Sequence, residues 1–390
     1  MTSTDERDTD QQVPFGRPML DADEIEAVTR VLSGPTLVHG PATRDFEEAF
    51  SRRIGADRAI SVSSCTAALH LSLLVSEVSR GDKVIVPAMT HVATAHAVEY
   101  CGATPVFVDV EAESGNIDPR RIAEIMADDV RAAIAVHYLG LPCDMDAIMP
   151  ILAERNTLLI EDCALAVDAT YGEKKVGTFG RAGCFSFYPI KHVTTLEGGM
   201  ITTDDDRFAE LLQQRKAFGY DRSLTQRSKP GIYDVTVLGY NYRMNEVEAA
   251  IGLKQLEKLD THQQVRARNY SILKEVLSEH AEITVFDTVQ GKANSSHYCL
   301  NAVLPQDGSI DRDSVVASLK ASGIGTSVHY PEAVPLMSYY REKYGYVPGQ
   351  FPVAEWLAAQ TISLPVGPHI SEGDAERIGS AFNFAIEESQ

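Results

Sequence analysis

The chain of 390 residues lacks several features that mark other classes of protein. Its six cysteines lie far apart and include no CxxC pair, which argues against a disulfide framework and against a zinc site. Positive charge is scarce: 35 basic against 55 acidic residues give a formal net charge of -20, which argues against nucleic acid and anionic membrane surfaces as partners. An anionic ligand would therefore need a locally basic pocket.

Two further absences concern the N-terminus and the cofactor fingerprints. Residues 1–13 are polar and acidic without an apolar stretch, so they predict a disordered arm rather than a signal peptide or membrane helix, and a cytoplasmic protein. No GxGxxG opens a helix after a strand, which counts against a dinucleotide-binding oxidoreductase.

The chain does contain a succession of short apolar runs separated by helix-like stretches. Continuous apolar runs are typical of strands buried on both faces, and their alternation with helices predicts an α/β fold with a mostly parallel sheet. Ligands of such sheets lie beyond the carboxyl ends of the strands. The seven runs are Ala59–Ser63, Lys83–Val86, Pro105–Asp109, Ala132–His137, Leu158–Asp162, Cys184–Phe187 and Met200–Thr203.

Beyond the last of these runs the pattern changes to longer helical stretches. Asn245 followed by Glu248 is typical of a capping pair and predicts a helix that links two domains. A strand is expected at Thr326–His329. We therefore expect a large domain over residues 14–250 and a smaller α+β domain over residues 251–390.

One lysine and one carboxylate carry the chemical signal. Lys191 lies in the segment Ser186–Gly199, downstream of Asp162, which closes an apolar run. Pyridoxal phosphate (PLP) chemistry needs a lysine to hold the aldehyde as a Schiff base and a carboxylate to keep the pyridine nitrogen protonated. Lys191 and Asp162 fit those roles, although Asp162 alone could instead bind a metal or cap a helix.

Hydroxyl groups in two places suit the cofactor's phosphate. Ser64, Cys65 and Thr66 follow the first predicted strand and open a helix, so their amides and hydroxyls form an anion site at its positive end. On this motif alone an ordinary Ser/Thr helix cap is the better explanation. Only the presence of Lys191 and Asp162 elsewhere in the chain makes a phosphate site the preferred interpretation. Ser186 would add a second hydroxyl, or bond to the backbone.

Two histidines are ambiguous. His91 either stacks on a flat cofactor ring or is a satisfied buried histidine, and taken alone the second is favoured. His329 either borders the substrate pocket from the small domain or is a core histidine that ends a strand.

The order of these motifs resembles that of the nucleotide-sugar aminotransferases of the DegT/DnrJ/StrS group over nearly the whole chain. The resemblance rests on Gly40-Pro41 before Phe46-Glu47, Ser64-Cys65-Thr66-Ala67-Ala68-Leu69, Pro105-Val106-Phe107-Val108-Asp109, Glu161-Asp162-Cys163-Ala164, the Lys191 segment with Glu197-Gly198-Gly199, and Gly239-Tyr240-Asn241-Tyr242-Arg243-Met244.

The resemblance implies PLP-dependent transferase fold type I, a seven-stranded sheet, and a homodimer that shares its active sites. It assigns Lys191 to the cofactor and to proton transfer, and Asp162 to the pyridine nitrogen. Further cofactor residues implied are Ser64, Cys65 through its amide, Thr66, Ser186, His91 at the ring-stacking position and Asn241 from a neighbouring subunit. Substrate-binding candidates are Arg243, which otherwise forms an interface ion pair, His192 and His329; no metal is expected.

Two positions depart from the family pattern. Leu165 stands where a Gln or His usually touches the cofactor's ring oxygen, and Leu196 replaces the glycine often found before Glu-Gly-Gly. The first change would retune the cofactor bond without abolishing it.

Three functions remain open from the sequence. The leading one is transfer of an amino group, with L-glutamate as donor, to the ketone of a nucleotide-linked keto-deoxysugar; the family branch that deoxygenates sugars has a histidine in place of Lys191. A second is an aminotransferase for a keto-cyclitol or other polyhydroxy ketone. A basic patch around Arg243 and the loop Arg222–Lys229 favours the diphosphate-bearing substrate over the cyclitol. The third is a non-catalytic PLP-fold regulatory protein.

Overall fold

The structure, a computed structural model, describes residues 12–221 and 232–389. Its centre is a seven-stranded sheet in the order β1-β9-β8-β5-β4-β2-β3, in which β9 runs antiparallel to both neighbours and the other pairs are parallel. All seven predicted runs form strands, and the mostly parallel sheet is confirmed. The strands are β1 (Arg58–Val62), β2 (Lys83–Pro87), β3 (Thr104–Val108), β4 (Val130–Val136), β5 (Leu158–Asp162), β8 (Ala182–Ser186) and β9 (Gly199–Thr203).

Side chains on successive residues of these strands enter different apolar cores. Val84 and Val86 of β2 belong to one buried cluster and Ile85 to another, and in β4 Ile134 and Ala133 divide in the same way. Since successive side chains point to opposite faces of a sheet, the two clusters lie on its two faces. The continuous apolar character of the strands is explained by burial on both sides.

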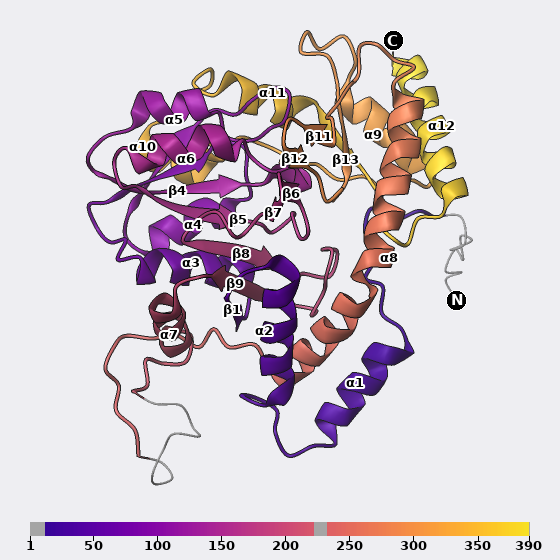
Figure 1. Ribbon diagram of the computed structural model, residues 1–390. Helices are drawn as coiled ribbons and strands as arrows, with labels where there is room; N and C mark the ends of the chain where they lie inside the picture. The colour runs from indigo at the N-terminus through magenta and orange to yellow at the C-terminus, as the bar shows by residue number, and fades with distance from the viewer. Residues whose placement is uncertain (1–11, 222–231, 390) are drawn as a thin grey trace, which may run out of the picture.

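Helices cover both faces of the sheet (Figure 1). α3 packs on β5, β8 and β9, while α6 packs on β5 from the other side. No helix in the described part of the chain combines the length and apolarity needed to cross a bilayer. The helices are α1 (Ala22–Leu32), α2 (Pro41–Ile54), α3 (Cys65–Val75), α4 (Val92–Tyr100), α5 (Pro119–Ile125), α6 (Met145–Ala153), α7 (Asp206–Arg215), α8 (Glu246–Leu277), α9 (Arg312–Ala321), α10 (Ser338–Tyr344), α11 (Pro352–Gln360) and α12 (Glu372–Ser389).

A smaller α+β unit follows along the chain. Helix α8 begins at the predicted capping pair, where Asn245 and Glu248 exchange side-chain to backbone hydrogen bonds of 3.0 Å each, and it runs from α1 and α2 to α12 (Figure 1). It therefore links the two parts of the molecule. The remaining strands are β6 (Thr170–Tyr171), β7 (Lys174–Lys175), β10 (Thr284–Val285), β11 (Val289–Gln290), β12 (Ala293–Asn294), β13 (Leu300–Val303) and β14 (Thr361–Leu364).

The packing differs from the predicted division at the start of the chain. Residues 1–11 of the predicted arm lie outside the described residues. Val13, however, is buried in the core of the smaller unit, where its amide donates to the Gly323 carbonyl at 2.9 Å and its carbonyl accepts from the Gly325 amide at 2.7 Å. Val13 is therefore not part of a disordered arm, because these backbone bonds fix the chain there.

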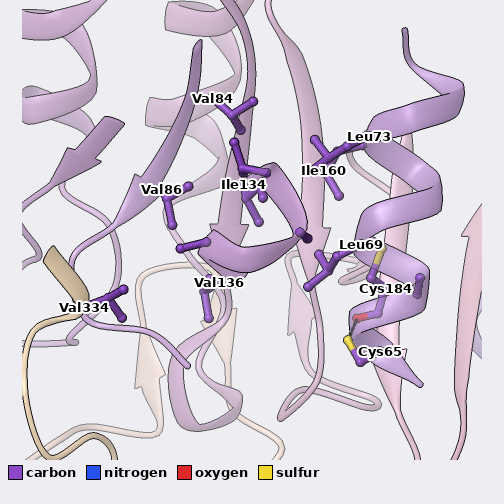
Figure 2. Packing of buried hydrophobic residues seen from close by; sticks show 14 of the residues in the cluster. Cys65, Leu69, Leu73, Val84, Val86, Ile134, Val136, Ile160, Cys184 and Val334 are labelled. Atoms are coloured by element: carbon purple, nitrogen blue, oxygen red, sulfur yellow. Dashed lines mark hydrogen bonds between the residues drawn. The ribbon is translucent and has the colours of Figure 1, made fainter. Parts of the chain in front are cut away.

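The division also differs within the C-terminal part. Val334, expected in the small domain, belongs to the core of the large sheet and lies near Val86 and Val136 (Figure 2). Its amide donates to the Ala88 carbonyl at 2.9 Å. The C-terminal part of the chain thus returns to the large sheet, which sequence periodicity could not show.

The strand expected at Thr326–His329 is wrong. Only Ser327 pairs, through two hydrogen bonds of 3.1 and 2.8 Å with Ser363 of β14. The segment then leaves the sheet, and His329 enters the aromatic cluster described below.

Candidate active site

Two paired strands end beside each other at the predicted edge of the sheet. Asp162 closes β5 and Ser186 closes β8, and the loop that follows β8 carries Lys191 before the chain returns as β9. The base of this loop is fixed by two hydrogen bonds of 2.9 Å, from the Phe187 amide to the Gly198 carbonyl and from the Thr195 amide to the Phe187 carbonyl. The loop therefore holds the lysine at the carboxyl ends of the strands.

The environment of Lys191 favours a neutral amine. Its Nζ lies 4.9 Å from the centre of the Tyr298 ring. Burial lowers the pKa of Lys191 from 10.5 to about 8, although Cys65 and Asp162 oppose that change. A neutral fraction is thus present near neutral pH, and the neutral amine is the form that attacks an aldehyde or accepts a proton.

Asp162 is buried with both carboxylate oxygens engaged. Oδ2 accepts from the Thr94 hydroxyl at 2.9 Å, and Oδ1 accepts from the Ala164 amide at 3.1 Å. The Cys65 thiol lies 3.9 Å from Oδ1. These contacts fix the carboxylate in one orientation, as a group that binds a cofactor nitrogen must be.

The start of α3, where the sequence predicts an anion site, lies close to β8. Ser64 is the helix cap, its Oγ accepting from the Ala67 amide at 3.1 Å, and the amides that follow lie where an α-helix has no acceptors of its own. A Cβ at Gly199 would stand 2.5 Å from the Ser64 carbonyl carbon, so only glycine lets β9 run this close. Ser186 is buried and pairs with Gly199. The structure thus places Ser186 near the Ser64–Thr66 turn; its role in binding phosphate stays a prediction.

His91 borders this site on another side. It caps α4, with Nδ1 accepting from the Ala93 amide at 3.2 Å, and its ring lies 5.7 Å from that of Tyr330. Partial burial, followed by the charge of Lys191, lowers its pKa. A neutral, partly exposed imidazole near the lysine suits the predicted stacking role, and the alternative of a fully buried histidine does not apply.

His329 is buried at the end of a closed hydrogen-bond network. Tyr138 donates its hydroxyl hydrogen to the His329 carbonyl and therefore accepts from the Asn301 Nδ2 at 3.1 Å. Asn301 Oδ1 then accepts from the Ser363 hydroxyl at 2.6 Å, so Ser363 can only accept from His329 Nδ1 at 2.9 Å. The network fixes the tautomer of His329 with its proton on Nδ1.

The tautomer leaves Nε2 of His329 as a hydrogen-bond acceptor. Burial, then the charges of Lys191 and His91, lowers the pKa of His329 to about 3, so the ring is neutral. Its ring lies 5.6 Å from that of Tyr298, which also contacts the lysine. His329 therefore bonds within the core through Nδ1, and its Nε2 is a candidate acceptor for contact with a substrate.

His192, the other histidine predicted at the substrate, does not face the same way. It is buried, with Nε2 donating to the Ser296 carbonyl at 2.9 Å. Burial, followed by the charge of Arg266, lowers its pKa well below the ordinary value. This placement favours a structural role, because the side chain that follows a loop lysine need not share its direction.

Asn241 and Arg243 lie on a different surface. Arg243 donates from Nε to Asn241 Oδ1 at 3.0 Å, and its guanidinium lies 4.9 Å from the centre of the Phe218 ring. Asn241 is exposed, and its contacts in this chain do not reach Lys191 or Asp162. The loop Arg222–Lys229, part of the predicted basic patch, lies outside the described residues.

Three buried residues in or next to β4 and β5 carry groups that could bind a metal. His137, Glu161 and Cys163 have ligand atoms within 4.8 Å of one another. Glu161 is, however, saturated by protein donors: the amides of Gly177 at 2.7 Å and Phe179 at 2.8 Å, and His137 at 3.1 Å. The group is satisfied as a structural network.

Sequence reasoning missed three residues that shape the site: Thr94, Tyr298 and Tyr330. Thr94 lies in the motif around His91, and a Thr one helical turn after Thr90 is the only signal that points to it. Tyr298 and Tyr330 come from the C-terminal part and carry no local motif. Leu165, at the usual Gln or His position, is buried in the apolar core.

A sequence profile of the DegT/DnrJ/EryC1/StrS aminotransferase family matches residues 18–383. The chain belongs to this family. It is similar to SpsC of Bacillus subtilis, a spore coat polysaccharide biosynthesis protein, with 35% identity over 373 residues, 94% of this chain and 95% of SpsC.

Solved structures agree with this assignment. Spr1654 of Streptococcus pneumoniae, known in PMP and PLP forms, matches in the PMP form with a TM-score of 0.92 and 26% identity, over 97% of this chain and all of that one. DesI, solved with its TDP-sugar product, matches with a TM-score of 0.87 and 29% identity over 97% of this chain and 94% of its own. The protein is therefore a PLP-dependent aminotransferase of fold type I.

Proposed function

We propose that the protein transfers an amino group from L-glutamate to the ketone of a nucleotide-linked keto-deoxysugar. The observation that carries the proposal is the intact pair of Lys191 and Asp162, held by a fold whose relatives include DesI with a TDP-sugar product. The geometry fits PLP: Asp162 would bind the pyridine nitrogen, and Ser64, the amides of Cys65 and Thr66, and Ser186 would hold the phosphate.

When bound, PLP withdraws electrons from the carbon that bears the amino group and makes its C–H bond acidic. Lys191 Nζ would accept that proton and later release it, which its lowered pKa permits near neutral pH. Asp162, fixed by Thr94, stays oriented throughout. Tyr298, which is buried, and Tyr330, which is partly buried, would shield the proton transfer from water.

The proposal includes a homodimer in which Asn241 reaches the phosphate of the neighbouring subunit. Large apolar side chains are exposed around Asn241, and a surface of this kind is typical of an interface. Backbone hydrogen bonds join the two segments that carry them, from the Phe218 amide to the Tyr240 carbonyl at 2.9 Å and from the Thr236 amide to the Gly219 carbonyl at 3.1 Å. The exposed residues are Leu37, Val38, Phe218, Ile232, Tyr233, Val235 and Leu238.

The first experiment is the near-ultraviolet and visible spectrum of the protein with PLP, before and after L-glutamate, beside Lys191→Ala. Loss of the band of lysine-bound cofactor on addition of glutamate, absent in the variant, is expected. A band that does not change when glutamate is added would contradict glutamate as the amino donor. A fully active Lys191→Ala variant would contradict the mechanism. Binding of UDP, GDP or dTDP then tests the nucleotide, and failure of all three favours a keto-cyclitol.

A further inference from the structure

A small recess lies where the N-terminal segment, the lysine loop, α8 and the loop before α12 meet. It is partly open to solvent, and its volume of about 10 Å³ leaves room for one small group. Neither the cofactor nor the substrate roles proposed above use it. The lining residues that matter are Arg17, Ile190, Arg266, Tyr298, Gly367 and His369.

Arg266 is a buried charge without a counter-charge. Only 5% of the residue is exposed, and its Nη1 donates to the Tyr298 carbonyl at 2.9 Å. Its Nε is buried with no hydrogen-bond partner, and no carboxylate among the described residues pairs with it. A buried guanidinium left in this condition is costly unless an anion or a polar group completes it.

The other polar groups of the recess are basic as well. Arg17 lies on its open side, and His369 donates from Nε2 to the Pro14 carbonyl at 2.9 Å while its Nδ1 is buried without a partner. Asp374, a carboxylate whose charge acts on His369, is engaged by the amide of Ser371 at 3.1 Å and its hydroxyl at 2.6 Å. Because Nε2 carries the proton and burial lowers the pKa of His369, its free Nδ1 is an acceptor and becomes a donor only on protonation.

We infer that Arg266 and Arg17, beside His369, form a binding site for a small anionic group, of the size of a carboxylate or a halide. The free edge of a planar guanidinium presents its N–H groups to such an anion, and a second arginine adds donors from another segment. A bound negative charge would also favour protonation of His369, whose Nδ1 would then donate as well. Because the bound anion would lie between Arg17, Arg266 and His369 on three segments, it would stabilise the contact between the two parts of the molecule.

The recess borders the lysine site. Ile190 precedes Lys191 in the loop, and Tyr298 contacts both the recess and Lys191 Nζ. The anionic group can therefore come from two sources of the same chemistry: a free anion from solution, or a carboxylate of the amino donor. The second source rests on the proposed function, whereas the site itself does not.

The first test measures thermal unfolding of the PLP-loaded enzyme in chloride or formate against the bulky anion gluconate, at constant ionic strength. Small anions are expected to raise Tm saturably by about 2 °C. Arg266→Gln should abolish the response. Arg268→Gln is the matched control, because Arg268 lies on the same helix but is partly exposed and paired with Glu372 at 3.1 Å.

Two variants keep the test decisive if Arg266→Gln does not fold. Arg17→Gln changes an exposed side chain and should weaken the anion response severalfold with Tm in gluconate unchanged. Gly367→Ala alters no charge, but its Cβ would stand 2.7 Å from His369 Nδ1 and should displace that ring. A response that survives both substitutions would overturn the site.

A direct test is bromide soaked into crystals of the PLP-loaded enzyme. An anomalous peak within contact distance of Arg266 Nε is expected. A peak on exposed lysines alone, with a water between Arg266 and His369, would overturn the inference and show that a solvent molecule satisfies both groups.

The donor half-reaction, monitored as the loss of the lysine-bound PLP band, distinguishes the two sources of the anionic group. If the glutamate carboxylate occupies the site, chloride raises the half-saturating glutamate concentration and Arg17→Gln does the same. If a free anion occupies it, that concentration does not change while the Tm response persists. Since Tm and bromide binding need no substrate, failure of the glutamate reaction alone would count against the proposed function and not against the site.

Discussion

Thr94 fixes the Asp162 carboxylate through a relay of hydroxyl groups. Its Oγ1 donates to Asp162 Oδ2 at 2.9 Å and lies 2.8 Å from Thr90 Oγ1. Since the one hydroxyl hydrogen of Thr94 goes to the carboxylate, Thr90 must be the donor of the second bond. All three residues are buried, so each bond counts toward the orientation of Asp162.

Replacement of Thr94 by Val keeps its shape and removes its hydrogen bond. A hydrogen bond to a buried charge contributes about 1.5 to 3 kcal/mol, so PLP affinity should fall at least about tenfold. The measurement is a spectroscopic titration of the cofactor-free protein with PLP. Thr90→Val serves as the control, because Asp162 keeps its direct donor; an equal loss in both variants would show that helix packing, not the carboxylate, is affected.

Gly199 at the start of β9 and Leu196 in the lysine loop should differ in their tolerance of substitution. Gly199→Ala places a Cβ 2.5 Å from the Ser64 backbone, so the start of α3 must shift and PLP binding should be lost. Leu196 has φ of 73°, a left-handed conformation that costs a leucine about 1 kcal/mol, so Leu196→Gly should leave Tm and PLP affinity near those of the wild type. Tm and PLP titration of both variants decide the matter; tolerance of Gly199→Ala would contradict the close approach.

The pKa of Lys191 predicts a pH dependence in the cofactor-free protein. Because burial lowers that pKa from 10.5 to about 8, the folded protein binds fewer protons here than the unfolded chain between those values. The cost of burying the charge is fully present below pH 8 and is relieved as pH rises through this window. The difference in Tm between wild type and Lys191→Met should therefore shrink from pH 7.5 to 9.5. A constant difference would mean that the lysine is not desolvated.

The proposed shared site predicts complementation between two inactive variants. In a mixed dimer of Lys191→Ala and Asn241→Ala, one site combines an intact lysine with an intact asparagine and the other has both defects. A 1:1 mixture refolded together should recover about a quarter of wild-type activity. The mixture of variants without subunit exchange is the control, and no recovery after exchange would place Asn241 in the site of its own chain.

The sequence by itself determined much of the fold and the positions of Lys191 and Asp162 in it. Strand and helix positions follow from local apolar patterning, and Lys191, Asp162 and the Ser64–Thr66 turn lie at strand ends, where a parallel sheet collects them. These predictions depend on residues within one or two elements. The structure and the family agree with that part of the analysis.

Only the tertiary structure decided the rest. Tyr298 reaches Lys191 from more than 100 positions along the chain, His192 turns to the Ser296 carbonyl, and Val334 returns to the large sheet. The sequence of α8, whose helical pattern is ordinary, likewise does not reveal that Arg266 is buried without a counter-charge. Such contacts depend on which distant segments meet, and local periodicity carries no information about them.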